Sequence, residues 1–145
     1  MIAIGSDHGG IKLKETVINY LKEKGLEYKD FGTYTTDSCD YPVFGKAVAN
    51  SVASKESEKG IVICTTGIGI SITANKVKGV RCALCSDSLS AKMTRLHNDA
   101  NVLAMGAGIV GENLALEIVE TFLNTEFSGE ERHQRRIDLI NNYNG

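Results

Sequence analysis

Residues 60–71 read Gly-Ile-Val-Ile-Cys-Thr-Thr-Gly-Ile-Gly-Ile-Ser. The apolar run from Gly60 to Cys64 is typical of a strand that is covered on both faces of a parallel sheet. Gly67 and Gly69 permit a close turn after it, and the residues that follow predict a helix near 69–77. A strand, a tight turn and a helix in this order indicate an α/β fold.

The rest of the chain repeats this unit. Apolar and β-branched runs predict further strands at 2–4, 28–31, 80–84 and 102–105, and amphipathic patterns predict helices from Ile11 to a stop at Gly25 and near 43–55, 88–97 and 112–124. Pro42, the only proline, falls in a polar loop that begins at Gly32. About five β–α repeats predict a three-layer α/β/α Rossmann-like domain with a parallel sheet of about five strands. The tail, 130–143, predicts a C-terminal helix that packs on a partner subunit.

Length and composition fit one folded domain over residues 1–145. The chain has 42% hydrophobic and 23% charged residues, which is an ordinary globular mixture. Its formal net charge of -2 offers no basic field for a nucleic acid. The sequence has neither an apolar run of the ~20 residues that cross a bilayer nor a secretory signal, so we expect a cytoplasmic protein without membrane contact.

Four cysteines, at positions 39, 64, 82 and 85, are too few for a disulfide framework and are expected to be thiols. Cys82 and Cys85 have the spacing of half a zinc site but lie in a predicted strand. Residues three apart on a strand face opposite sides, so we interpret them as buried core residues. The sequence predicts no metal site.

Ligands of open α/β sheets bind beyond the carboxyl ends of the strands. Asp7 and His8 follow the first strand between glycines, and this setting favours a binding role over a simple helix cap by Asp7. Cys64 ends the third strand, where the N–H groups that follow favour a thiolate and an anion-binding nest.

Two familiar motifs do not fit the turn after Cys64. A dinucleotide-binding fingerprint needs a glycine at Ile72, and a phosphatase loop needs an arginine at Ile70. A cysteine hydrolase that pairs Cys64 with His97 remains an alternative, because nucleophile and base need only meet in space.

Two further clusters lie later in the chain. His97, Asn98 and Asp99 close a predicted helix, which we expect near the ligand edge, where the histidine could serve as an acid. Arg132 and Arg136 are four residues apart, so on a helix their guanidinium groups share a face and could bind one phosphate.

Five motifs together resemble the type B ribose-5-phosphate isomerases and their galactose-6-phosphate isomerase relatives. They are Gly5-Ser-Asp-His-Gly-Gly, Asp40-Tyr-Pro, Cys64-Thr-Thr-Gly-Ile-Gly-Ile-Ser-Ile-Thr-Ala-Asn-Lys, His97-Asn-Asp-Ala-Asn and Arg132-His-Gln-x-Arg136. The resemblance spans nearly the whole chain. It implies an enzyme that interconverts ribose 5-phosphate and ribulose 5-phosphate through a cis-enediolate, with no metal or organic cofactor.

The resemblance also implies a role for each candidate residue. Cys64 would be the base, His97 would open the sugar ring, and Thr66 would assist at the ring oxygen. Asp7 and Tyr41 would hold sugar hydroxyls. The enediolate would be held by Asn98 and by the N–H groups of Thr65, Gly67, Ile68 and Gly69. The phosphate would be held by His8, Arg132 and Arg136. Family members form homodimers, sometimes homotetramers, so His97 and Asn98 are expected from the neighbouring subunit.

The chemistry agrees with these roles, since aldose–ketose exchange needs one base, donors for an oxyanion and an acid for ring opening. The chain departs from the family at Thr65, where many relatives have glycine, and at Gly108, where many have a phosphate-binding arginine. These departures predict a broader substrate range. Alternatives are therefore an isomerase of a hexose 6-phosphate or of a free aldose such as allose, a cysteine-dependent hydrolase, or a non-catalytic sugar-phosphate-binding protein.

Overall fold

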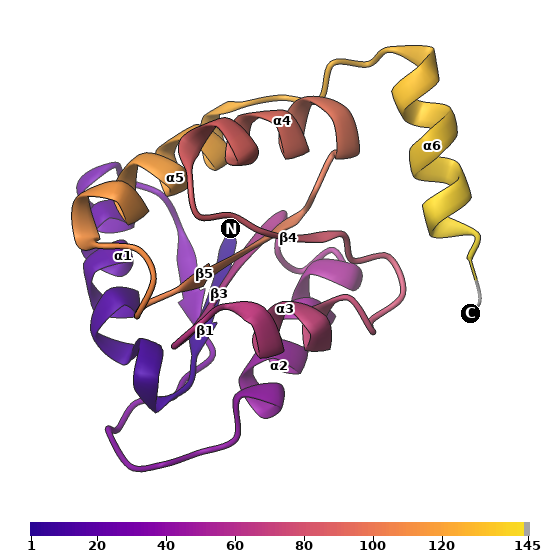
Figure 1. The fold of residues 1–145 in the computed structure, drawn as a ribbon. Helices are drawn as coiled ribbons and strands as arrows, with labels where there is room; N and C mark the ends of the chain where they lie inside the picture. Colours follow the sequence, from indigo (N-terminus) through magenta and orange to yellow (C-terminus); the bar gives the residue numbers. More distant parts are fainter. Residues whose placement is uncertain (144–145) are drawn as a thin grey trace.

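The computed structural model describes residues 1–143, whose central element is a five-stranded sheet (Figure 1). All four neighbouring pairs are parallel, and the order is β2-β1-β3-β5-β4. The strands are β1 (Ile2–Ser6), β2 (Tyr28–Asp30), β3 (Lys59–Cys64), β4 (Cys82–Leu84) and β5 (Val102–Gly106). The parallel α/β sheet predicted from the sequence is confirmed.

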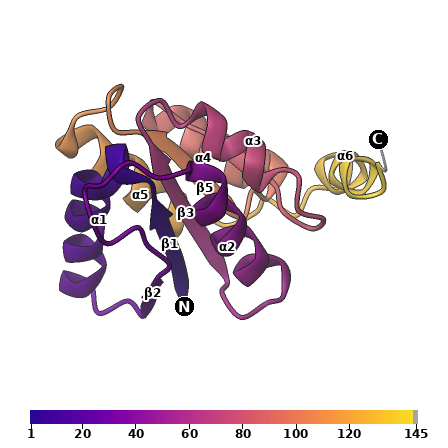
Figure 2. The same cartoon turned by 90° about the horizontal axis from the view of Figure 1, so that it is seen from below.

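Helices cover both faces of the sheet, which makes the three layers visible in Figure 2. One face packs against α1 (Ile11–Glu23), α4 (Ser88–Asn98) and α5 (Glu112–Asn124), and the other against α2 (Tyr41–Ala53) and α3 (Ile68–Ala74). A short 3-10 helix, η1 (His8–Gly10), precedes α1. Because each connecting helix returns the chain to the start of the next strand, the helices run antiparallel to the strands.

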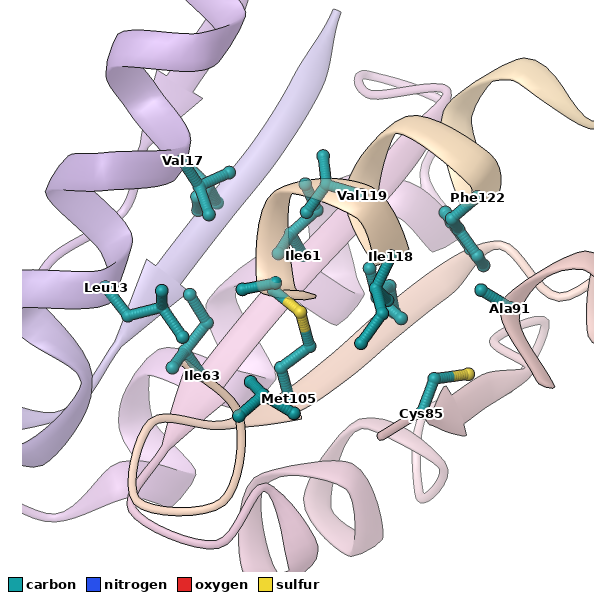
Figure 3. Packing of buried hydrophobic residues seen from close by; sticks show 14 of the residues in the cluster. Leu13, Val17, Ile61, Ile63, Cys85, Ala91, Met105, Ile118, Val119 and Phe122 are labelled. Atoms are coloured by element: carbon teal, nitrogen blue, oxygen red, sulfur yellow. The ribbon is translucent and has the colours of Figure 1, made fainter. Parts of the chain in front are cut away.

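The core on the α1 side is built from strand residues such as Ile61, Ile63 and Met105 against helix residues such as Val17 and Ile118, which are all fully buried (Figure 3). The second core lies between the sheet and α2 and α3. β3 is apolar on both faces because it lies in the middle of the sheet, with helices on each side.

The last helix, α6 (Glu131–Asn141), lies to one side of these layers, far from α1 (Figures 1 and 2). It contacts α4, and the loop before it is tied to α4 by a hydrogen bond from the Ser128 N–H to the Leu96 carbonyl, 3.2 Å. Its residues Leu139 and Ile140 remain exposed. The C-terminal helix predicted from the sequence is confirmed, and no helix among residues 1–143 has the length and apolarity to span a membrane.

Two local predictions needed correction. Pro42 lies in the first turn of α2, where its fixed φ fits and its missing N–H has no helical partner to lose, instead of in the preceding loop. Cys82 and Cys85 do face opposite sides of the sheet, as predicted, but Cys82 is partly exposed. Burial and, to a smaller extent, repulsion from Cys85 raise the pKa of the Cys82 thiol to about 12. Burial and, to a smaller extent, repulsion from Asp87 raise the pKa of the Cys85 thiol to about 11, so both thiols stay neutral.

Candidate active site

The strand order places a topological switch point between the loops that follow β1 and β3. From β1 the chain goes to β2 on one side, whereas β3 pairs on the other side of β1. The loops after β1 and β3 therefore leave the sheet in different directions, which is the position where α/β proteins bind ligands. Ser6 pairs with Ile63 in the register, so Asp7 and Cys64 start these two loops side by side.

Cys64 is the best-defined candidate of this carboxyl edge. Its side chain is buried, and its Sγ accepts a hydrogen bond of 3.1 Å from the Gly67 N–H. Gly67 adopts a left-handed conformation with φ of 77°, and a Cβ there would lie 2.7 Å from the Met105 carbonyl carbon. Only glycine fits this position, and it aims an N–H at the sulfur.

The other residues of the predicted nest have partners within the loop. The Ile68 N–H donates to the Thr66 Oγ1 at 3.2 Å, so the threonine hydroxyl lies over the start of α3. Two of the N–H groups expected to stabilise an enediolate are thus occupied, by Cys64 and Thr66. A substrate oxygen at this place would share or replace these partners.

Thr65 lies between two glycines. The Gly108 N–H donates to the Thr65 carbonyl at 2.8 Å, and a Cβ on Gly108 would lie 3.1 Å from that oxygen and 3.2 Å from the threonine Cγ2. On the other side, a Cβ on Gly9 would collide with the Thr65 hydroxyl. The two departures from the family pattern are therefore direct neighbours in space.

Asp7, His8 and Tyr41 surround the same loop. Asp7 is buried and caps η1 by accepting the Gly10 N–H at 3.1 Å, so the cap interpretation that the sequence disfavoured is present in the structure. His8 Nδ1 accepts the Cys39 N–H at 3.2 Å, which leaves the proton of a neutral ring on Nε2. Tyr41 begins α2, and its ring packs on Gly69, where a Cβ would lie 2.6 Å from the phenol oxygen.

His97 and Asn98 lie at the opposite, amino edge of the sheet. They end α4 shortly before β5, whose preceding residue Asn101 accepts the Gly60 N–H at 2.9 Å. Five residue steps of about 3.3 Å separate the two edges along β3, roughly 16 Å. The expectation that this cluster lies near the ligand edge of its own chain is wrong, because α4 runs antiparallel to the strands.

Two buried or partly buried arginines fix the end of α4. Arg81 donates to the backbone carbonyls of Asn98 and Asp99 at 3.0 and 2.9 Å, and Arg95 pairs with the Asp99 carboxylate at 2.8 Å. Neither arginine was predicted from the sequence. The spacing of Arg95 and Asp99, four residues apart on a helix, was the available signal.

The arginines of α6 complete this second cluster. Arg132 and Arg136 lie on α6 as predicted and are exposed, and Arg132 pairs with Glu130 at 3.4 Å. Between them, His133 is buried and contacts His97, with 4.3 Å between the ring centroids. His133 lies in the motif Arg132-His-Gln-x-Arg136, for which the resemblance implies a role only for the two arginines.

The structure therefore sorts the predicted residues into two groups. The carboxyl-edge group comprises Asp7, His8, Tyr41 and Thr65 to Gly69 with Cys64, and the amino-edge group comprises His97, Asn98, Arg132 and Arg136. One chain does not bring Cys64 and His97 together, which argues against a cysteine hydrolase built within a single chain. Within residues 1–143 no group of three or more histidine, cysteine or acidic side chains could hold a metal ion.

Comparison with known proteins gives the family. Residues 2–140 match the Ribose/Galactose Isomerase family. The chain belongs to this family. It is 46% identical over 139 residues to ribose-5-phosphate isomerase B of Escherichia coli, covering 96% of this chain and 93% of that protein.

Solved structures of ribose-5-phosphate isomerases B have the same fold as this chain. Ribose-5-phosphate isomerase B of Clostridium thermocellum matches with a TM-score of 0.95 and 54% identity, over 97% of this chain and 94% of that one. The Mycoplasma genitalium enzyme, solved with bound ribulose-5-phosphate, matches with a TM-score of 0.94 and 42% identity, over 98% and 94% of the two chains. The resemblance inferred from the five motifs is confirmed, and the chain is a sugar-phosphate isomerase by family.

Proposed function

We propose that the chain acts as one domain that interconverts ribose 5-phosphate and ribulose 5-phosphate. The observation that carries this proposal is the thiol of Cys64, which ends the central strand at the switch point, where its sulfur accepts a hydrogen bond from the Gly67 N–H. A buried sulfur held by a backbone donor is suited to remove a proton from carbon. The relatives named above are isomerases of this sugar phosphate.

The reaction divides into ring opening and proton transfer. His97 gives a proton to the furanose ring oxygen as its bond to C1 breaks, the C1 hydroxyl loses its proton to water as the aldehyde forms, and Thr66 assists at the ring oxygen. Cys64 then takes the proton from C2, and the loop N–H groups and Asn98 hold the enediolate, whose negative charge lies on O1. Cys64 returns its proton to C1 while the O2 proton moves to O1, which gives the ketose. Asp7 and Tyr41 hold hydroxyl groups, while His8, Arg132 and Arg136 hold the phosphate.

Such a site needs the carboxyl-edge group of one copy and the amino-edge group of another, because within a chain the two are roughly 16 Å apart. Support comes from the surface beside the edge strand β4, where large apolar side chains are exposed on α3, β4 and α4; they are Ile68, Ile72, Leu84, Leu89 and Met93. A second copy that covers them would form a homodimer.

A groove of about 750 Å³ supports the same arrangement. It lies between α6 and the residues around β4, and its lining includes Asn98 and Ile140 but no residue of the Cys64 loop. This groove is therefore at the amino edge, where a second copy would be received, rather than at the thiol.

The test is to follow ribose 5-phosphate, and the phosphates of allose and galactose, by NMR in deuterated water. We expect ribulose 5-phosphate to form and deuterium to enter C2 of the aldose. Free ribose is the control for the phosphate requirement. Release of inorganic phosphate would favour a hydrolase, and binding without turnover a sugar-phosphate-binding protein; either result contradicts the proposal.

A further inference from the structure

His133 and His97 form a pair of imidazole rings where α6 meets α4. Their centroids are 4.3 Å apart and the rings are tilted by 40°. His133 is 5% exposed, whereas His97 is partly exposed, so one ring backs the other from the interior. The function proposed above assigns a role to His97 but none to the buried ring of His133.

The position of His133 is fixed from the side away from His97. Its Nδ1 lies 3.0 Å from the Ser128 Oγ and 3.6 Å from the Glu130 carboxylate. Ser128 is itself tied to the end of α4 through the Leu96 carbonyl, and Arg95 donates to the Thr125 carbonyl at 2.9 Å. The loop before α6 thus holds the His133 ring at a set distance from the last turn of α4.

The charges around His133 oppose a proton on its ring. Burial is the largest influence that lowers its pKa, followed by repulsion from His97, Arg132 and Arg136, while Glu130 alone raises it. Two imidazolium rings in contact would repel each other, which further opposes a proton on His133.

We propose that His133 is a positioning residue that holds the imidazole of His97 in place for ring opening. The proposal rests on the ring-opening role proposed for His97. His133 does not touch the substrate. Its ring limits the rotation of His97, and its neutral state avoids a second positive charge beside the acid.

The kinetic test compares cyclic ribose 5-phosphate with an acyclic substrate analogue in three variants. His133→Ala is expected to lower kcat for the cyclic sugar about tenfold and to leave the acyclic analogue within about twofold, because only ring opening needs the acid. His133→Phe keeps a neutral ring and is expected to restore most of the rate. Ile137→Ala, one turn along the buried side of α6, loosens the helix without removing the ring and is expected to preserve the cyclic-to-acyclic ratio.

An equal loss on both substrates in His133→Ala, or the same change of ratio in Ile137→Ala, would overturn the proposal in favour of simple docking of α6. A second measurement needs no substrate and so remains informative even if the proposed function fails. The chain has 3 histidines, which NMR can resolve. The Cε1–H signal of His133 is expected to titrate below the ordinary midpoint of about pH 6.5, and titration at or above it would contradict a neutral ring beside His97.

Discussion

The two groups of candidate residues are held in different ways. In the carboxyl-edge group the backbone does most of the positioning, through the left-handed Gly67, its hydrogen bond to Cys64 and the contact of Gly108 with Thr65. In the amino-edge group side chains do this work, through Arg81, Arg95 and the paired histidines. The backbone of one loop thus fixes the carboxyl-edge group, whereas the amino-edge group lies on two helices held by a few side-chain contacts.

The largest expected effect lies in the carboxyl-edge group. Cys64→Ala should lower kcat by about 1,000-fold, because it removes the base, and should leave substrate binding nearly unchanged. Turnover by NMR and binding by calorimetry check this. Cys82→Ala, which removes a neutral thiol away from the Cys64 loop, is the matched control and should keep its activity. Near-normal turnover of Cys64→Ala would remove the thiol from the mechanism.

A mixing experiment tests whether the two groups work across chains. Cys64→Ala and His97→Asn proteins should each be nearly inactive, since each lacks a part of every site. After subunit exchange, half of the pairs are mixed and each has one intact site out of two, so about a quarter of the wild-type activity should return. Each variant taken alone through the same treatment is the control. No recovery despite demonstrated exchange would mean that each site is built within one chain.

Two glycine-to-alanine variants test how rigid the backbone of the carboxyl edge is. Gly67→Ala should cost about 2–4 kcal/mol of unfolding free energy, because it combines a positive φ with a Cβ only 2.7 Å from the Met105 backbone. Gly79→Ala has a similar φ of 89° but no heavy atom within 4 Å, so its cost should be about 1 kcal/mol. Denaturant unfolding gives both values, and equal costs would show that the loop around Gly67 yields easily.

The smallest expected effect concerns Gly108. An arginine there should raise kcat/KM for ribose 5-phosphate by about tenfold, with no gain for free allose, because it adds a donor to the phosphate. Its Cβ would be crowded by Thr65, so Gly108→Arg alone should gain less than the double variant Thr65→Gly/Gly108→Arg. Steady-state kinetics on both sugars check this. If both variants remain folded and neither changes kcat/KM for ribose 5-phosphate or for free allose, Gly108 lies away from the phosphate.

The sequence predicted the strands and helices well because their signals are local. The apolar run Gly60–Cys64 and the spacing of apolar residues after Ile11 each define one element without its neighbours. The edge on which His97 lies depends on the direction of α4 relative to the strands, which the residues around it do not encode. The role of His133 depends on how α6 docks on α4, a contact between segments that only the fold brings together.

The separation of the two groups on opposite edges of the sheet has a consequence for the rate law. If every site needs two chains, then below the dissociation constant of the pair the number of sites rises with the square of the protein concentration. Dilution would then abolish activity while leaving each chain folded. A sugar phosphate that contacts both chains binds only the pair, so by mass action it would strengthen the association that its own turnover requires.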